Sequence, residues 1–472
     1  MKLTKKQIKG GNIMLGVIGI IISLGLLIYL AYRGITVLIL APVLALLAVL
    51  FQGGATHVLA NYTEVFMVNF AAYAKTYFPV FLLGAIFGKL MDDSGAAKSI
   101  AYTISSKLGK GKAILAVVLS SSILTYGGVS MFVVAFAVYP IAAELFREAD
   151  IPKRFLPASI AIGSFTFTMT ALPGTPQIQN AIPMPFFGTN LYAAPVLGLI
   201  GAALMFGGCM FWIEGRAKKA MAKGEGYGIH PDEIIQELDL SKLPKISVAL
   251  TPIILVLVVN YLLGKYVFAT MDGAFLKDFG GISITKVQGI WSLITSLVIA
   301  IIVSIILMWK NLENITKTVN KGAIGSLLAI ANTSSEVGYG NVIKTLGAFA
   351  VIQAGILAIP GTPLISLAAS TSILAGITGS ASGGMSIALG ALGDIYMQKA
   401  QVLGISPQVL HRIAAMACGG LDSLPHNGAV ITLLGITGMT HKQSYADIGM
   451  CTVVIPMVSA AICIVFASMG VV

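Results

Sequence analysis

The chain alternates long apolar runs with short polar connections. Because a helix needs about 20 predominantly apolar residues to cross a bilayer, each long run predicts a membrane-spanning helix. A polar insert at residues 214–245 interrupts the pattern near the middle and is predicted to be a cytoplasmic linker. The predicted spans are 12–32, 35–51, 192–212, 246–269, 287–309 and 446–469, and less regular candidates are 77–91, 322–340 and 342–359.

The composition places the chain in a membrane. It is 57% hydrophobic and 10% charged, whereas soluble domains carry about a quarter charged residues. The net charge is +11, and the lysines and arginines lie mostly in short loops between apolar runs. This distribution is the positive-inside bias of a multi-pass protein of the bacterial plasma (inner) membrane. It excludes nucleic acid as a partner. The apolar run after residues 1–11 is longer than the core of a signal peptide, which favours an uncleaved first helix. The cysteines form no CxxC pair, so we expect neither disulfides nor a metal site.

Two parts of the chain resemble one another. The motif "GGVS" at 127–130 is matched by "GGMS" at 383–386. Further along, "DIPKRFL" is matched by "GISPQVL", and "ALPGTPQIQN" by "SLPHNGAVIT". Three matches in the same order and at similar spacing indicate a duplicated unit. The predicted organisation is a first repeat at 1–213, the linker at 214–245 and a second repeat at 246–472.

The loop charges predict that the two repeats have opposite orientations. Basic residues flank the first glycine pair on both sides, as for two cytoplasmic ends, whereas the flanks of the second pair carry few charges, chiefly Lys399 and Arg412. The apolar arm at 113–124 rises only about 18 Å as a helix and cannot cross. An inversion places the N-terminus outside, while the lysines of the leader favour inside, so this side stays open. The predicted re-entrant hairpins span 113–146 and 363–400, and the predicted broken helices span 155–190 and 407–438.

Glycines, hydroxyls and prolines interrupt these apolar segments. A break exposes N–H groups at the start of the following half-helix, where the helix dipole is positive. Two opposed breaks therefore form a carboxylate site without a buried arginine or lysine. The alternative is that Gly-Gly-Ser marks only close helix packing. The candidate hydroxyls are Thr125, Ser130, Thr175, Ser380, Ser382 and Ser386, and Gly127, Gly128, Gly383 and Gly384 let the backbone approach a ligand.

Ionisable residues inside apolar segments are costly and indicate function. His426 titrates near neutral pH and is a candidate proton carrier, with Asp422 as its partner or rival. Glu336 is a third candidate for coupling to protons. The structural alternatives are that His426 satisfies a freed carbonyl at the break and that Glu336 makes a hydrogen bond within the bundle. The chain has no Walker A, HExxH or dinucleotide motif, so we expect no cofactor and an ion gradient as the energy source.

The tips "GGVS" and "GGMS", the motif "ANTSSEVGYG" and above all "GLDSLPHNGAVITLL" resemble the gluconate permease family of bacterial proton symporters. That family belongs to a broader ion-transporter superfamily with citrate and dicarboxylate carriers. The resemblance implies an all-α fold with a dimerising scaffold domain, a moving transport domain and two opposed hairpins. It also implies uptake of small hydroxycarboxylates with protons, and "PHNGAV" resembles branches for 3-hydroxybutyrate or other short acids. It also implies that Thr175 belongs to the substrate site and adds Gly174, Gln177, Ser423 and Asn427.

Proton-coupled import of a small organic anion is the first functional hypothesis. An anion exchanger or a sodium-coupled carboxylate transporter of the same fold is the alternative, and the tips lack the Ser-Asn-Thr of sodium-coupled relatives. A membrane-embedded enzyme is disfavoured, because the chain has no cluster of nucleophile, base or metal ligands. A helix pair over residues 246–309 is expected to support a homodimer.

Overall fold

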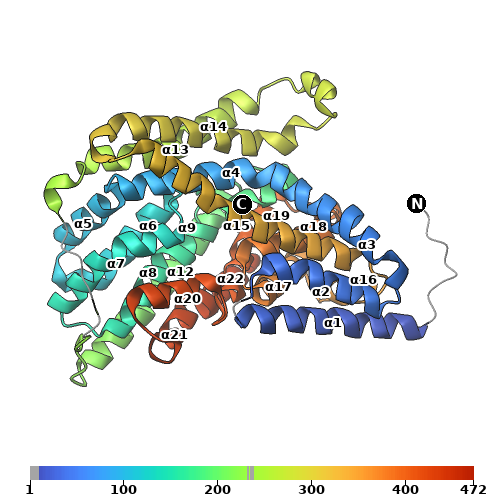
Figure 1. The fold of residues 1–472 in the computed structure, drawn as a ribbon, viewed down its shortest axis with the longest axis horizontal. Helices are drawn as coiled ribbons and strands as arrows, with labels where there is room; N and C mark the ends of the chain where they lie inside the picture. The colour runs from blue at the N-terminus through green and yellow to red at the C-terminus, as the bar shows by residue number, and fades with distance from the viewer. Residues whose placement is uncertain (1–9, 34, 231–232, 234–238) are drawn as a thin grey trace.

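The computed structural model describes residues 10–33, 35–230, 233 and 239–472, and it is built from helices, with no β-strand among these residues. Figure 1 shows α13 and α14 along one edge, α5 to α8 at one end, and α1, α2, α16 and α17 at the other. The first half comprises α1 (Gly10–Tyr32), α2 (Val37–Phe51), α3 (Val58–Ala60), α4 (Val68–Asp93), α5 (Ala96–Leu108), α6 (Ala113–Tyr126), α7 (Met131–Glu148), α8 (Leu156–Phe165), α9 (Phe167–Thr170), α10 (Ile178–Ala181), α11 (Pro183–Phe187) and α12 (Pro195–Met221). The second half comprises α13 (Ile246–Leu262), α14 (Ile284–Leu307), α15 (Ile315–Thr345), α16 (Phe349–Leu357), α17 (Pro363–Thr378), α18 (Ala381–Val402), α19 (Pro407–Cys418), α20 (Gly428–Thr437), α21 (His441–Gly449) and α22 (Ile455–Ser468).

Short turns of 3₁₀ or π helix extend or connect these helices. Three of them are π-helical and continue an α-helix without a break: η2 (Asn61–Met67), η6 (Leu263–Phe268) and η10 (Met450–Val454). The 3₁₀ turns are η1 (Ala55–His57), η3 (Lys110–Lys112), η4 (Lys153–Phe155), η5 (Leu240–Lys242), η7 (Ala274–Phe279), η8 (Trp309–Asn311) and η9 (Leu421–Ser423).

Six helices of the described chain are long and apolar enough to cross a membrane, which supports a multi-pass membrane protein. They are Ile13–Ala31, Ala55–Asp93, Pro195–Met221, Ile246–Phe268, Ile284–Leu307 and His441–Ser468. The predicted span at 35–51 is shorter, because α2 has only 15 residues. The predicted span at 342–359 is wrong, because Leu346 takes an extended ψ of 131° that ends α15 before α16 begins.

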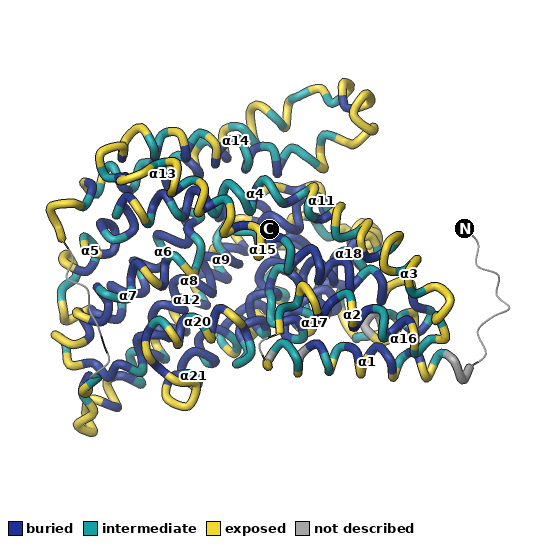
Figure 2. The backbone as a smooth tube through the Cα atoms, in the orientation of Figure 1, coloured by how far each residue is buried: buried dark blue, intermediate teal, exposed yellow. Residues whose placement is uncertain are grey.

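The helices pack into two cores. The larger core includes buried side chains from α4 to α22, and the smaller one joins α1 and α2 to the C-terminal part of α15. Helix α15 also packs along α4, where Gly322 lies so close that a Cβ would stand 2.7 Å from the Cα of Ile86. Figure 2 shows buried residues gathered in the middle of the molecule and exposed residues mostly at its periphery. The long α15 therefore belongs to both cores.

Two helix pairs and two interrupted helices correspond to the segments that the sequence singled out. Residues 127–130 connect α6 to α7 and are called the first tip, and residues 379–380 connect α17 to α18 and are called the second tip. The first break, residues 171–177, separates α9 from α10, and the second break, residues 419–427, separates α19 from α20 and contains η9. Each break contains proline, which cannot donate a helical hydrogen bond. A bend of 104° also separates α5 from the α6 arm.

The second glycine pair does not lie in a connection, which differs from the expected match between "GGVS" and "GGMS". Gly383 and Gly384 are in the first turn of α18, and the turn itself is made by Gly379, whose φ is +63°. Ser380 caps α18 by accepting a hydrogen bond of 3.1 Å from the Gly383 N–H. A Cβ at Gly384 would stand 2.1 Å from the backbone nitrogen of Ala375, so this glycine serves close helix packing.

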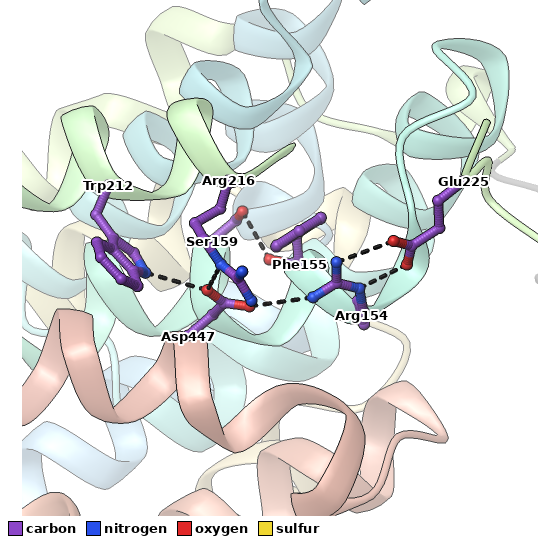
Figure 3. A network of polar contacts seen from close by, with 7 residues as sticks. All are labelled: Arg154, Phe155, Ser159, Trp212, Arg216, Glu225 and Asp447. Carbon is purple, nitrogen blue, oxygen red and sulfur yellow. Dashed lines mark hydrogen bonds and ion pairs between the residues drawn. The ribbon is translucent and has the colours of Figure 1, made fainter. Parts of the chain in front are cut away.

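The polar insert packs on the corner between α7 and α8. Its first residues continue α12 to Met221, so the helix extends beyond the predicted start of the linker. Arg154 donates to Glu225 at 2.9 Å and also approaches Asp447 at 3.5 Å. Asp447 further accepts hydrogen bonds of 3.0 Å from Arg216 and Trp212 (Figure 3). This network ties the insert, α12 and α21 together.

Candidate functional site

The first tip is held by the helix that follows the first break. The side-chain amide of Gln177 donates hydrogen bonds of 2.7 Å to the carbonyl of Thr125 and 3.2 Å to that of Val129. Gly128 has a φ of +93°, and a Cβ there would stand 2.8 Å from the Cγ of Pro176. The predicted residues of the first tip and the first break are thus in direct contact.

The second tip is held in a similar way. The side-chain amide of Asn427 donates a hydrogen bond of 2.9 Å to the carbonyl of Gly379. Its oxygen accepts hydrogen bonds of 2.6 Å from Ala429 N and 3.0 Å from Val430 N, so the same side chain caps α20. Gln177 and Asn427 both occupy the N-cap position of the helix after a break. Each break is therefore fastened to its own tip by one amide side chain.

The start of the second break lies against the end of α9, directly before the first break. Gly419, at the start of the second break, would carry a Cβ only 2.6 Å from the Cγ2 of Thr170, the last residue of α9. Behind them passes α12, where a Cβ at Gly198 would stand 2.6 Å from the carbonyl oxygen of Ala171. Glycine is required at both points because backbone and side chains leave no room for a Cβ. The chain thus brings interrupted helices from both halves into one region.

Buried polar atoms without partners gather at both tips. At the first tip and break these are the hydroxyls of Thr125 and Thr175, which make no hydrogen bond to any described residue. At the second tip they are Oε2 of Glu336 and Nε2 of His426. Because a buried polar group without a partner is destabilising, such a concentration marks a place for a ligand or water. Sequence reasoning gave no role to other buried side chains with an atom that makes no hydrogen bond to a described residue, among them Tyr73, Ser121, Gln179, Ser334 and Ser335.

Glu336 and His426 lie on either side of the second tip. A Cβ at Gly383 would stand 1.4 Å from Oε2 of Glu336, so the carboxyl group packs directly on the backbone of α18. A Cβ at Gly379 would stand 3.0 Å from Cδ2 of the His426 ring. Glu336 is only 4% exposed. The structure therefore places two of the predicted proton-carrying residues at the same turn.

Asp422 occupies a different position. It is buried and accepts a hydrogen bond of 3.1 Å from the hydroxyl of Ser423. The Ser423 carbonyl in turn accepts a hydrogen bond of 3.1 Å from Tyr445. In the described part of the chain, no hydrogen bond joins Asp422 to His426. Asp422 and Ser423 therefore face α21 through Tyr445, while His426 faces the second tip.

A buried arginine corrects the expectation that the site lacks one. Arg412, placed by the sequence in a sparse loop flank, is fully buried in α19 with 0% exposure. Its guanidinium donates hydrogen bonds to the carbonyls of Leu191 and Ala193 and to the Asn180 side chain at 2.8 to 3.2 Å. These acceptors carry no net charge. Within the described residues, the positive charge of Arg412 is therefore not balanced by a carboxylate.

The position of Arg412 is close to the first break. Its Nε atom and the Cδ atom of Pro173 both lie 3.2 Å from the point where a Cβ at Gly198 would stand. The neighbouring His411 is also buried, and its ring nitrogens lie 2.6 Å from the Thr189 hydroxyl and 3.0 Å from the Asn180 oxygen. Sequence reasoning gave His411 and Arg412 no role at the site. The pair "HR" inside a helix that is otherwise apolar was the available signal.

No group of three or more His, Cys, Asp or Glu side chains in the described chain is arranged to hold a metal ion. The four cysteines are free and buried.

The comparisons with known proteins agree on the class of protein. The chain is 47% identical over 468 residues to the uncharacterized transporter YxjC of Bacillus subtilis, covering 96% of this chain and 99% of that one. It is 31% identical over 124 residues to the high-affinity gluconate transporter of Escherichia coli, which is 26% of each chain. The fold is similar to the crystal structure of the YdaH transporter of Alcanivorax borkumensis, with a TM-score of 0.56, 16% identity, and coverage of 87% of this chain and 89% of that one.

The spans, the interrupted helices and these relatives define a membrane transporter. A family model described as "Na+/H+ antiporter family" matches residues 186–470, more than half of the chain. The chain belongs to this family. The family match and the similarity to the gluconate transporter of Escherichia coli support the resemblance to gluconate permeases. The assignment to a 3-hydroxybutyrate branch stays a prediction.

Proposed function

We propose that the protein imports a small organic anion, a hydroxycarboxylate such as 3-hydroxybutyrate or gluconate, together with protons. The observation that carries this proposal is the buried charge of Arg412 beside the first break. A fixed positive charge in a low-dielectric interior attracts an anion strongly, because little solvent screens it. The relative described as a high-affinity gluconate transporter adds support.

The substrate site in this proposal lies between the two tips and the two breaks. Its carboxylate faces the N–H groups that begin the half-helices after the breaks, where the helix dipole is positive. The unpaired hydroxyls of Thr125 and Thr175 supply further hydrogen bonds. The residues assigned to substrate binding are Thr125, Gly127, Gly128, Ser130, Gly174, Thr175, Gln177, Ser380, Ser382, Gly383, Ser386, Ser423 and Asn427. Gly384 is left out because it packs against the backbone of Ala375.

Proton coupling is assigned to the ionisable groups around the second break. Glu336 and His426 flank the second tip, and each has a buried atom free of hydrogen bonds to described residues. A carboxyl group without a partner is easily neutralised by a proton, since burial disfavours its charge. Asp422 is a third carrier, on the side that faces Tyr445.

Alternating access would come from the inverted repeats, with α6/α7 and α17/α18 as re-entrant hairpins that enter from opposite faces of the bilayer. Helices α13 and α14 serve as the scaffold. One face of α13 exposes Ile254, Val258 and Leu262 at helical spacing, with exposed fractions of 53%, 47% and 46%. Such a stripe suits either lipid or the same helix of a second protomer in a homodimer. The bacterial origin of the relatives supports an inner-membrane location.

Uptake by proteoliposomes tests the function directly. With an acidic exterior, labelled 3-hydroxybutyrate or gluconate should accumulate inside, and a proton ionophore should abolish the accumulation. The Arg412→Gln protein should lose substrate binding, while Arg147→Gln, which alters an exposed arginine at the end of α7, should behave as wild type. Uptake that ignores an imposed pH gradient in wild type contradicts proton coupling.

The family description favours a second candidate, exchange of Na⁺ for H⁺. Glu336 and Asp422 are buried carboxylates, 4% and 5% exposed, of the kind that such an exchange requires. The two functions differ in whether proton movement requires an organic anion. If a Na⁺ gradient alone moves protons in proteoliposomes without any organic anion, the protein is an antiporter. If proton movement appears only when a carboxylate is added, it is a symporter.

A further inference from the structure

A separate cavity lies at the end of α13 that is far from the polar insert. Its volume is about 250 Å³, slightly below the 300–1,000 Å³ that is typical of drug-sized ligands. This size suits a small carboxylate or a phosphate group. The lining of the cavity includes Asn190, Tyr192, Asn260, Tyr261, Lys265 and Ser292. These residues come from α13, the π-helical turn η6, α14 and the loop between α11 and α12.

Asn260 provides the cavity with an unused hydrogen-bond donor. Its side chain is only 3% exposed, and its Nδ2 atom makes no hydrogen bond to any residue that the structure describes. A buried amide in a membrane helix is costly unless something accepts its hydrogen bond. The π-helical turn that begins three residues later is a type of irregularity often found at functional sites. Asn260 thus indicates an acceptor atom in the cavity.

The charge of the cavity indicates that this acceptor is anionic. Among its described lining residues, Lys265 is the charged one, and no acidic side chain lines the cavity. The Lys265 ammonium donates a hydrogen bond of 2.9 Å to the Tyr261 hydroxyl and lies 5.3 Å from the centroid of the Tyr261 ring. These contacts hold the ammonium against Tyr261, which also lines the cavity. One cation and one unused donor that line the same cavity are suited to an oxyanion.

A single aromatic ring separates this cavity from the first break. Tyr192 lines the cavity, and a Cβ at Gly174 in the break would stand 2.6 Å from its Cε1 atom. The Tyr192 hydroxyl donates a hydrogen bond of 2.7 Å to the carbonyl of Leu257 on α13. Its ring also packs edge-to-face on Tyr261 at 5.2 Å. Tyr192 is therefore the partition between the cavity and the break.

We propose that this cavity is a second oxyanion-binding site, which holds a carboxylate or phosphate group between the Asn260 amide and the Lys265 ammonium. If the occupant is the transported anion, the cavity is its waiting position outside Tyr192; that assignment rests on the proposed function. If the occupant is the phosphate of an anionic lipid, the same donors bind it. The site exists in either case, and the two sources are separable by experiment.

Cysteine labelling tests the site without requiring transport. The four native cysteines are buried, so an added cysteine can be followed over a low background. Ala269→Cys places a thiol in the cavity wall. The protein is reconstituted in nanodiscs of phosphatidylcholine and treated with methanethiosulfonates bearing either a sulfonate or a trimethylammonium group. Sodium gluconate, 3-hydroxybutyrate and inorganic phosphate are then added as protecting probes.

The sulfonate reagent should react about tenfold faster than the cationic reagent, because a fixed charge concentrates counter-ions locally. Lys265→Gln should remove this preference, and Lys277→Gln, which alters a lysine of η7 outside the cavity, should keep it. At least one soluble anion should slow labelling, and Asn260→Leu should cancel that protection. Because Lys265 is exposed, its variant gives a result even if Asn260→Leu fails to fold.

The lipid composition of the nanodiscs shows whether the bound anion is a lipid phosphate or a soluble acid. Protection only in nanodiscs that contain phosphatidylglycerol assigns the site to a lipid phosphate, while protection by gluconate or 3-hydroxybutyrate in phosphatidylcholine assigns it to the soluble acid. Equal labelling by both reagents, with no protection by any soluble anion or by phosphatidylglycerol, overturns the site. Since these readouts need no gradient, a protein that binds an anion here but transports none contradicts only the proposed function.

Discussion

The side-chain amide of Gln177 donates a 2.7 Å hydrogen bond to the backbone carbonyl of Thr125. Asn427 makes the corresponding bond of 2.9 Å to Gly379 in the other half of the chain. Both amides stand at the N-cap of a short helix that follows a break, and both contact the turn of the adjacent helix pair. Displacement of either break is therefore transmitted to its tip.

Loss of the Gln177 amide should uncouple the first tip from the first break. Gln177→Leu leaves the carbonyls of Thr125 and Val129 without their donor, which costs about 1–3 kcal/mol for a buried acceptor. We expect a lower Tm and at least a several-fold loss of uptake. Gln401→Leu, at an exposed position near the end of α18, is the matched control and should change neither. Unchanged uptake by Gln177→Leu would show that the amide has no part in transport.

Gly383 should tolerate no side chain. In Gly383→Ala the new Cβ would stand 1.4 Å from Oε2 of Glu336, so the carboxyl group must leave its position against α18. We expect transport to be lost even where the protein folds. Gly390→Ala lies on the same helix, and the nearest atom to its Cβ is Nδ2 of Asn341 at 3.9 Å, so this control should stay active. Uptake assays and size-exclusion profiles of the two proteins check this prediction. A Gly383→Ala protein that transports as well as Gly390→Ala would contradict it.

The packing of the polar insert against the rest of the protein should depend on a buried ion pair. Lys153 and Glu233, with side chains 4% and 6% exposed, are 2.8 Å apart, and the Glu233 carboxylate also accepts hydrogen bonds from Tyr139 and Tyr227. Lys153→Met leaves the carboxylate buried without its cation, which typically costs about 3–5 kcal/mol. A clear fall in Tm is expected. Lys218→Met removes an exposed lysine that is 3.6 Å from Glu214 and should leave Tm almost unchanged. Equal melting temperatures for the two variants would contradict this role.

The attachment of the insert should weaken in acid. The hydrogen bond from Arg154 holds the pKa of Glu225 below its ordinary value of 4.5. A carboxyl group whose pKa is lowered by folding stabilises the fold above its unfolded pKa, and this contribution disappears as the pH falls through the folded pKa. Glu225→Gln should therefore have a slightly lower Tm than wild type at pH 7, and the difference should shrink as the pH falls below 4.5 and vanish once the pH lies below the pKa of the folded Glu225 carboxyl group. A difference that stays constant from pH 7 down to the onset of acid unfolding would exclude this ion pair as its cause.

The helices that surround the site could be predicted from the sequence, because the lengths of the apolar runs and the positions of the prolines determine where these helices begin and end. The sequence placed helix pairs and breaks near the observed α6/α7, α17/α18, first break and second break. It misplaced the second turn, because Gly379 rather than the Gly383–Gly384 pair adopts the positive φ. A glycine pair has the same sequence whether it forms a turn or allows close helix packing. Only the position of the neighbouring helix distinguishes these two roles.

The burial of Arg412 was outside the reach of the sequence. A basic residue at the beginning of an apolar run normally marks a membrane boundary. Here the carbonyls of Leu191 and Ala193 and the Asn180 oxygen, more than two hundred positions earlier in the chain, accept its hydrogen bonds. Contacts over that separation have no local signature. The approach of Glu336 to Gly383 and of His426 to Gly379 has no local signature for the same reason.

Helix α15 has 31 residues and therefore a length of about 46 Å. Ile330 and Val337 are fixed in the larger core, and Tyr339 and Val342 in the smaller one. Glu336 stands where one body of packing gives way to the other. In the proposed proton coupling, a change of charge at Glu336 would act where this helix passes from one core to the other, so a small tilt of the helix there would displace side chains in both cores.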